Sequence, residues 1–255
     1  MSGEPNMSDR PLHENRHRAG SFGSAAAEYD RYRPRYPQAL LTGLLPSGAA
    51  VALDVGAGTG ILSEQLAATG VQVLAVEPDP RMAQVAAAKG LPVEVSMFEE
   101  WDPAGRQFDV VVFGSSFHWV EPRQALRKVT TLLKPDGRLA LLWNRVTPIS
   151  PDRQAIDAVY SEFLAPTARP PVDADRTAGV SELIEECGFV IDRRHVVEHL
   201  HYRTDDWVSM ACTYSNILTL DPHDRSEFRK RLKQCIGTGG VIAENDALAV
   251  VCTPR

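Results

Sequence analysis

Short apolar runs alternate with amphipathic segments through the middle of the chain. The apolar runs are typical of strands that are covered on both faces, and the segments between them have the spacing of helices. The predicted strands cover residues 50–55, 71–76, 92–96, 108–113 and 138–143, and the predicted helices cover residues 60–69, 79–89 and 122–133. Strands that alternate with helices in this way predict an α/β fold, a mostly parallel sheet with helices on both faces.

The segments that flank this alternation are less regular. Residues 1–20 are polar and charged, and we expect a disordered tail there. We expect one domain over residues 21–255, because a chain of 255 residues with 44% hydrophobic residues can bury one large core. Within that domain, residues 21–49 contain two short helices around a proline-rich link, and residues 145–176 contain an insertion with a proline-rich loop.

Towards the end of the chain the pattern again predicts regular elements. These are helices over residues 153–164, 177–187, 204–219 and 222–236, and strands over residues 194–202 and 247–253. Trp207, Met210, Tyr214 and Leu218 recur at helical spacing, which is more typical of a core than of a pocket.

The most specific local pattern is a glycine-rich turn after the first strand of the alternation. It reads Leu53-Asp54-Val55-Gly56-Ala57-Gly58-Thr59-Gly60, and the next strand is followed by Glu77. A strand, a glycine-rich turn, a helix and a second strand that ends on an acid predict a site for a ribose-bearing ligand. A dinucleotide motif would need a third glycine at Ile61, and the carboxylate of Asp54 favours a cationic ligand over a pyrophosphate.

This motif resembles the first motif of the class I S-adenosylmethionine-dependent methyltransferases, and the chain looks most like their type 11, small-molecule group. The resemblance covers about residues 22–144. It implies a Rossmann-like fold with seven strands in the order 3-2-1-4-5-7-6, the seventh antiparallel. It also implies S-adenosylmethionine as cofactor and a small-molecule acceptor methylated on oxygen or carbon, with a carboxylate as one candidate. A non-catalytic S-adenosylmethionine-binding regulator, an NAD(P)-dependent oxidoreductase and an enzyme with a macromolecular acceptor remain alternatives.

The resemblance also implies which residues hold the cofactor. Asp54 would bind the amino group, Glu77 the ribose hydroxyls beside Pro78, and the glycine turn would let the methionine part lie against the backbone. The remaining implied cofactor contacts are Gly56, Ala57, Gly58, Gly60, Met97, Phe98, Glu99 and Gly114, with Tyr29 and Arg33 contributed by an N-terminal lid. Alternatives are that Glu77 is an exposed acid near a helix N-terminus, that Met97 and Phe98 are core or surface residues, and that Arg31 or Arg35 takes the role of Arg33.

His118 and Trp119 are the candidate catalytic residues. They follow the strand over residues 108–113, at the edge of the sheet where ligands collect in such folds. The imidazole and the indole N–H could orient a substrate carboxylate, or His118 could act as a general base. The alternatives are a structural histidine at position 118 and a packing role for Trp119 under the next helix.

Composition narrows the classes of partner. The net charge of −6 argues against a general nucleic-acid binder, and no apolar run is long enough to span a membrane. The four cysteines are scattered singly, as in reduced cytoplasmic proteins, and His195, His199 and His201 lack an acidic cluster, so we expect no metal site. We therefore expect a cytoplasmic monomer or homodimer with a small-molecule substrate.

Overall fold

The computed structural model describes residues 12–165 and 179–255, which divide into two compact units. Unit 1 takes its described residues from 1–33, 146–174 and 199–245, and unit 2 takes them from 34–145, 175–198 and 246–255. We expected one domain over residues 21–255. The segment over residues 21–49 that we expected to form a lid is shared between the units, with residues 34–49 in unit 2.

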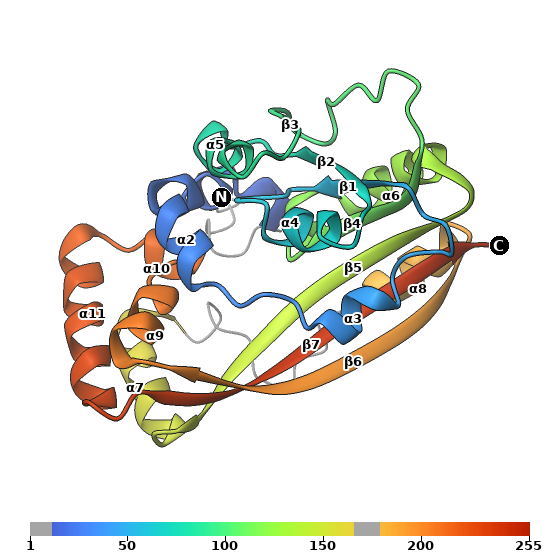
Figure 1. Ribbon diagram of the computed structural model, residues 1–255. Helices are drawn as coiled ribbons and strands as arrows, with labels where there is room; N and C mark the ends of the chain where they lie inside the picture. Colours follow the sequence, from blue (N-terminus) through green and yellow to red (C-terminus); the bar gives the residue numbers. More distant parts are fainter. Residues whose placement is uncertain (1–11, 166–178) are drawn as a thin grey trace, which may run out of the picture. The chain divides into compact units, whose positions relative to one another are not determined.

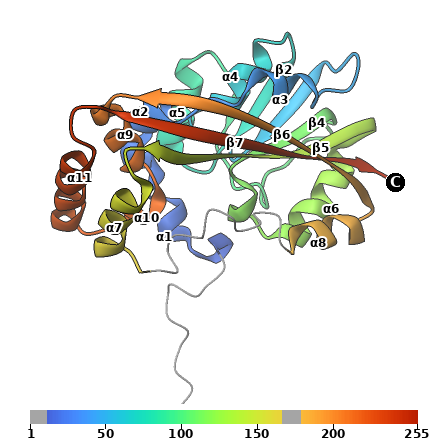
Figure 2. The same ribbon diagram turned by 90° about the horizontal axis from the view of Figure 1, so that it is seen from below.

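Seven strands form one sheet in the order β3-β2-β1-β4-β5-β7-β6 (Figure 1). They are β1 (Val51–Val55), β2 (Gln72–Val76), β3 (Val93–Glu94), β4 (Phe108–Gly114), β5 (Leu133–Ser150), β6 (Phe189–Tyr202) and β7 (Val241–Pro254). The pairs β1–β2, β1–β4, β2–β3 and β4–β5 are parallel, and β7 runs opposite to β5 and β6 (Figure 2). The predicted α/β class and strand order are confirmed.

The last three strands are longer than predicted, and each has residues in both units. Because these strands continue through the boundary, no change of composition marks it in the sequence. Residues 134–137, between the predicted helix over 122–133 and the predicted strand over 138–143, form an irregularity within β5, where the register with β4 shifts. Asp136 has a positive φ of 63°, and a Cβ on Gly137 would lie 2.8 Å from the carbonyl oxygen of Lys134. A short backbone distortion therefore interrupts the regular pairing of β5 with β4.

The carboxylate of Asp109 aligns the amino ends of three strands in unit 2. Its Oδ2 accepts hydrogen bonds from the backbone N–H groups of Ala50 and Val51, both at 2.9 Å, at the start of β1. The same oxygen lies 3.0 Å from Nζ of Lys134 in β5. Because Asp109 itself belongs to β4, one side chain ties together three neighbouring strands.

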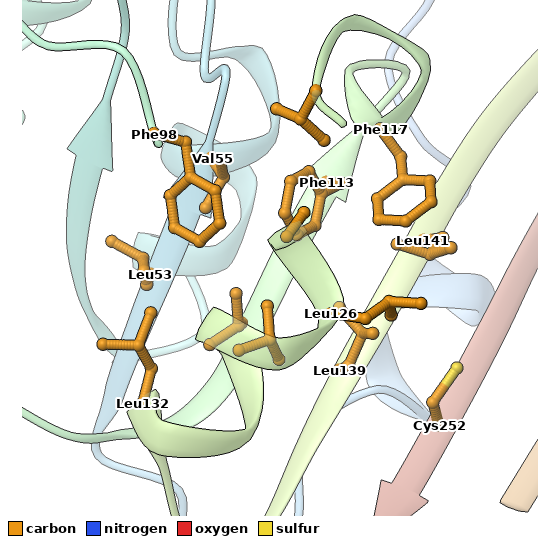
Figure 3. Packing of buried hydrophobic residues seen from close by; sticks show 14 of the residues in the cluster. Leu53, Val55, Phe98, Phe113, Phe117, Leu126, Leu132, Leu139, Leu141 and Cys252 are labelled. Carbon is orange, nitrogen blue, oxygen red and sulfur yellow. The ribbon is translucent and has the colours of Figure 1, made fainter. Parts of the chain in front are cut away.

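Helices cover both faces of the sheet in unit 2. They are α3 (Gln38–Thr42), α4 (Ile61–Ala67), α5 (Pro80–Ala88), η3 (Phe117–Trp119), α6 (Pro122–Leu132) and α8 (Val180–Glu186). Alternate residues of each central strand enter different cores. Leu53 packs with the residues of α6 (Figure 3), and Val111 belongs to the same core. Ala52 and Val110 pack with the residues of α3 and α4. This double burial explains why the strands read as continuous apolar runs.

Unit 1 is mainly helical. Its helices are η1 (Leu12–Glu14), α1 (Arg16–Ala19), η2 (Phe22–Ala25), α2 (Ala26–Tyr32), α7 (Arg153–Phe163), α9 (Thr204–Ala211), α10 (Ser215–Leu218) and α11 (Pro222–Ile236). Buried residues of α7, α9 and α11 form its core, in which Tyr160 and Phe228 contact edge to face. Trp207 and Met210 are 3% and 1% exposed in this core, as their helical spacing predicted.

Two predictions for unit 1 differ from the structure. Residues 12–14 and 16–19, which we expected in a disordered tail, are helical, and Asn15 caps α1 by accepting a hydrogen bond from the Arg18 N–H. Residues 1–11 and most of the expected proline-rich loop lie outside the described residues. The single helix predicted over 204–219 is two helices, because Tyr214 is extended and the Thr213 hydroxyl donates to the carbonyl of Met210.

Candidate functional site

The glycine-rich turn links β1 to α4 at the carboxyl edge of the sheet. Gly56, Gly58 and Gly60 have positive φ values of 64°, 59° and 77°, which residues other than glycine seldom adopt. The N–H groups of Gly56 and Ala57 both donate to the carbonyl oxygen of Val76, at 2.8 and 3.2 Å. The turn is therefore held over the end of β2.

The three glycines are required for different reasons. A Cβ on Gly56 would lie 2.6 Å from Cβ of Ser116, and a Cβ on Gly60 would lie 2.6 Å from Cδ1 of Leu91. Gly56 and Gly60 therefore allow the protein to pack against itself. This differs from our expectation that all three glycines make room for a ligand. At Gly58 the nearest atom to such a Cβ is Cε of Met82, at an ordinary contact distance of 3.4 Å.

Glu77 is a buried part of this turn, at 7% exposure. Its Oε2 accepts a hydrogen bond from the Gly58 N–H at 2.8 Å, and its Oε1 accepts one from the Asp79 N–H at 2.9 Å. Burial raises the pKa of Glu77 to about 7, and the neighbouring charges of Asp79 and Asp54 act in the same direction. This burial contradicts the alternative that Glu77 is an exposed acid near a helix N-terminus. The residue that caps α5 is Asp79.

Asp54 is an even more deeply buried acid, at 1% exposure. Its Oδ2 accepts a hydrogen bond from the Ser63 hydroxyl at 2.6 Å, whereas its buried Oδ1 has no hydrogen-bond partner in the part of the chain that the structure describes. Burial raises the pKa of Asp54 to about 6. A buried, half-partnered carboxylate is costly, and a cationic ligand group would offset that cost.

The segment after β3 supports the core alternative for Phe98. Phe98 is 3% exposed and contacts Phe113 edge to face and Trp101 in a stacked arrangement. Figure 3 shows its ring within the core beside Val55. Met97 and Glu99 are half-buried, so of the three residues these two keep accessible surface at this edge.

The segment after β4 turns sharply. A Cβ on Gly114 would lie 2.9 Å from Cδ2 of Leu62, so packing within the protein excludes a side chain there. The Ser116 hydroxyl donates to the carbonyl oxygen of Val55, and Ser115 Oγ lies 3.2 Å from the hydroxyl oxygen of Tyr36. These hydrogen bonds tie the end of β4 to the end of β1 and to the segment before α3.

His118 and Trp119 follow this turn in η3, with ring centroids 4.8 Å apart. His118 is exposed and Trp119 is half-buried. The residue of η3 that fills the core is Phe117, which contacts Phe113 edge to face (Figure 3). The two candidate catalytic rings therefore keep accessible surface at the same edge as the glycine turn.

Tyr29 and Arg33 belong to unit 1, where they contact each other. The Arg33 guanidinium lies 4.8 Å from the ring centroid of Tyr29 and 3.8 Å from that of Tyr214. Its Nε donates to the Thr213 hydroxyl and its Nη2 to the Thr213 carbonyl oxygen, at 2.8 and 3.0 Å. Their role as a lid stays a prediction.

Sequence reasoning missed the polar residues that hold the site in shape. Ser63, Ser116 and Tyr36 are single polar side chains without a motif of their own. The position of Ser63 in the first turn of α4, directly after the glycine turn, could have identified it as a residue of the site. The roles of Ser116 and Tyr36 depend on contacts between distant segments.

Neither a metal cluster nor a membrane span is found in the described residues. Across residues 12–165 and 179–255, no group of three or more histidine, cysteine, aspartate or glutamate side chains is arranged to hold a metal ion. Over the same ranges, no helix is long and apolar enough to cross a membrane. The four cysteines are free thiols.

The fold is that of an α/β protein with a glycine-rich turn and two buried acids at the carboxyl edge of a mixed sheet. A family model described as a methyltransferase domain matches residues 53–141. An uncharacterized methyltransferase of Mycobacterium tuberculosis is 32% identical over 234 residues, which cover 90% of this chain and 91% of that protein. The chain therefore belongs to the class I S-adenosylmethionine-dependent methyltransferase family.

Other relatives are more distant. A ubiquinone biosynthesis O-methyltransferase of Xanthomonas axonopodis is 35% identical over 131 residues, which cover 48% of this chain and 54% of the relative. The structure of a proposed type II methyltransferase from Anaeromyxobacter dehalogenans superimposes with a TM-score of 0.59 at 21% identity. That superposition covers 86% of this chain and 97% of the other, and it supports the fold.

The residues of the turn fit S-adenosylmethionine, the cofactor of this family. Oδ1 of Asp54, which has no hydrogen-bond partner among the described residues, is a buried acceptor suited to the cofactor's ammonium group. Gly58 leaves the turn open on one side, and within the described residues each carboxylate oxygen of Glu77 accepts one hydrogen bond. A carboxylate offers about four acceptor positions, so Glu77 retains capacity for two ribose hydroxyls.

Proposed function

We propose that the protein transfers a methyl group from S-adenosylmethionine to an oxygen or carbon atom of a small-molecule acceptor. The observation that carries this proposal is the buried carboxylate of Asp54, whose Oδ1 lacks a partner among the described residues, beside the Gly58–Glu77 hydrogen bond. Together they supply an acceptor for an ammonium group and acceptors for ribose hydroxyls. When bound, the cofactor supplies an electrophilic methyl group on a sulfonium.

The protein's contribution on the cofactor side is orientation. Asp54 would hold the amino-acid end of the cofactor and Glu77 its ribose, and Gly58 would leave the backbone of the turn accessible to the cofactor. Because the backbone N–H groups of Gly58 and Asp79 donate to Glu77, its carboxylate oxygens are already positioned before the cofactor binds. Holding reactants in near-attack geometry supplies up to about 7–11 kcal/mol in favourable systems.

On the acceptor side, His118 and Trp119 orient the nucleophile. Trp119 Nε1–H is a donor for an anionic or hydroxyl-bearing substrate, and the His118 imidazole either orients a carboxylate or removes a proton from a hydroxyl or carbon acid. Both rings adjoin the turn that Ser116 ties to β1.

The proposed activity is tested directly by product formation. The protein is incubated with S-adenosylmethionine and a panel of small carboxylates, phenols and metabolite extracts, and S-adenosylhomocysteine is measured by mass spectrometry. Turnover above the acceptor-free rate supports the proposal. Tight cofactor binding without turnover on any acceptor would favour a non-catalytic binding protein.

We expect His118→Ala and Trp119→Phe each to lower kcat at least tenfold, equivalent to about 1.4 kcal/mol of transition-state stabilisation. Cofactor affinity should change by less than about twofold, because neither side chain belongs to the glycine turn. A pH–rate profile then separates the two possible roles of His118. A general base makes the rate fall below a pH of about 6.5, whereas an orienting residue need not. Normal turnover by the His118 variant would place the acceptor elsewhere.

The raised pKa of Asp54 leads to a separate prediction about stability. Its pKa is about 6 in the folded protein against 3.8 when exposed, so ionisation costs stability as the pH rises through that window. Two pH units correspond to about 3 kcal/mol. Asp54→Asn should therefore raise the melting temperature of the ligand-free protein at pH 8, with the gain shrinking towards pH 4.

The same variant should lose cofactor affinity, because the neutral amide no longer pairs with an ammonium group. Calorimetry with S-adenosylhomocysteine and thermal melts at pH 4, 6 and 8 measure both effects. Glu185→Gln, an exposed acid of α8, is the matched control and should change neither. A less stable Asp54 variant at pH 8, with unchanged affinity, would contradict the proposed role.

A further inference from the structure

Unit 1 contains a cavity of about 520 Å³ at the start of α9 and the loop that joins α11 to β7 (Figure 1). Residues 201–205, residues 237–240 and Lys233 line it, and all of them belong to unit 1. This volume lies within the range of small-molecule sites. Asp54 and Glu77 belong to unit 2, so the cavity is separate from the residues proposed to hold the cofactor.

The loop over residues 237–240 reads Gly-Thr-Gly-Gly, so few side chains cover its backbone. The Thr204 hydroxyl donates to the carbonyl oxygen of Gly237 at 2.7 Å, which ties the loop to the start of α9. Within residues 12–165 and 179–255, the N–H groups of Thr238 and Gly239 find no hydrogen-bond acceptor. Backbone N–H groups of this kind are available to bind an anion.

The side chains at the cavity carry more positive than negative charge. Among the lining residues, all of which the structure describes, the one carboxylate is that of Asp205, and its Oδ1 lies 2.6 Å from Nζ of Lys233. The hydrogen bond from Lys233 lowers the pKa of Asp205, and the charges of Arg203 and Arg229 act in the same direction. Arg229 precedes Lys233 by one turn of α11. One carboxylate therefore faces three cations.

Two of these cations are left without a carboxylate in contact. In the part of the chain that the structure describes, the exposed side chains of Arg203 and Arg229 form neither an ion pair nor a hydrogen bond. Arg203 also takes the N-cap position of α9 without a capping hydrogen bond, although a cation is unfavourable beside a helix N-terminus. Positive potential is thus concentrated here in a protein whose net charge is −6.

These features select the chemistry of the ligand. Free loop N–H groups and an excess of cations match a phosphate group, which has several acceptor oxygens and close to two negative charges at neutral pH. The cavity is larger than a phosphate ion, so space is left for an attached organic group. We propose that residues 237–240 together with Arg203 and Lys233 form a binding site for a phosphate-bearing small molecule. Arg229 adds positive potential, and Lys233 is shared between Asp205 and the ligand.

The test measures anion binding and does not depend on methyl transfer. Calorimetry and phosphorus NMR follow the titration of inorganic phosphate and of glycerol 3-phosphate into the full chain at low ionic strength, with acetate as the comparison anion. All substituted residues are exposed, and the matched control is an exposed lysine of α11 that does not line the cavity. The variants are Arg203→Gln, Lys233→Gln, Asp205→Asn and Gly239→Glu, and the control is Lys230→Gln.

The variants should shift the affinity for phosphate in opposite directions. Arg203→Gln and Lys233→Gln should each weaken binding about tenfold, because each removes a charge-assisted hydrogen bond. Asp205→Asn should tighten binding about threefold, because it removes the competing carboxylate and releases Lys233. Gly239→Glu should abolish binding, since its carboxylate enters the cavity where a Cβ meets no atom within 4 Å.

Comparison of the two phosphate compounds identifies the source of the group. Tighter binding of glycerol 3-phosphate indicates a phosphate ester, and equal affinities indicate the inorganic ion. Thermal melts accompany each titration. If Gly239→Glu does not fold, the opposite shifts expected for Arg203→Gln and Asp205→Asn decide the result.

Three results would overturn the proposal. The first is a wild type that binds neither phosphate compound at millimolar concentrations. The second is acetate bound as tightly as phosphate, and the third is a loss of affinity in Lys230→Gln equal to that in Arg203→Gln, because both would mean general attraction of anions to the surface. None of these results bears on methyl transfer, and a protein without methyltransferase activity would leave this test unchanged.

Discussion

Replacement of Gly58 by valine is expected to lower cofactor affinity at least a hundredfold while the protein stays folded. Gly58 has a φ of 59°, which a β-branched residue adopts only with strain of about 1–2 kcal/mol. On the protein side the new Cβ would have only ordinary contact with Met82 Cε, at 3.4 Å. The substitution should therefore mainly lower the affinity for a ligand that lies against the turn. Calorimetry with S-adenosylhomocysteine measures this affinity.

Two further glycine variants make this experiment specific. Gly70→Val introduces valine at a φ of 91° with no atom within 4 Å of the new Cβ, so it reproduces the strain away from the turn. It should bind the cofactor normally. Gly60→Val, in contrast, would place its Cβ 2.6 Å from Cδ1 of Leu91 and should destabilise the fold. If Gly58→Val binds as tightly as Gly70→Val, the turn is not the cofactor site.

The second large effect is expected from Glu77→Ala. The variant loses the acceptors for two ribose hydroxyls, and hydrogen bonds to a charged group contribute about 1.5–3 kcal/mol each. It also leaves the N–H groups of Gly58 and Asp79 without their acceptor, so the turn loses its support. We expect at least a hundredfold weaker binding of S-adenosylhomocysteine, about 2.7 kcal/mol, by calorimetry.

Asp79→Ala is the matched control for Glu77. The control removes the neighbouring carboxylate that caps α5, at a cost of about 0.5–2 kcal/mol in stability, but keeps the backbone N–H that contacts Glu77. Its cofactor affinity should stay within about threefold of the wild type. Equal losses in the two variants would mean that general loosening of the turn, and not the ribose contact, explains the effect of Glu77→Ala.

The part of the fold that could be predicted is the part with local signals. The central strands read as continuous apolar runs because Leu53 and Ala52 enter different cores, both of them buried. The turn could be located because positive φ at Gly56, Gly58 and Gly60 demands glycine. Glu77 was identified by its position after β2, and its contact with a ligand stays a prediction.

The remainder depends on contacts between distant residues. Nothing near Phe98 in the sequence shows that its ring packs between Phe113 and Trp101 and not at the surface. The hydrogen bonds that join Arg33 to Thr213 span 180 positions. The boundary between the units could not be seen either, because long strands cross it without a linker.

Asp109 shows that a residue at one edge of the sheet can determine the geometry of a site at the opposite edge. It joins the first residues of β1 to β4 and β5, whereas Asp54 and Ser116 stand at or beyond the other ends of these strands. A slip of one residue between neighbouring strands would reverse which side chains face each core, and it would separate Ser116 from Val55. Loss of methyl transfer after substitution of Asp109 would therefore be no sign that residue 109 meets a substrate.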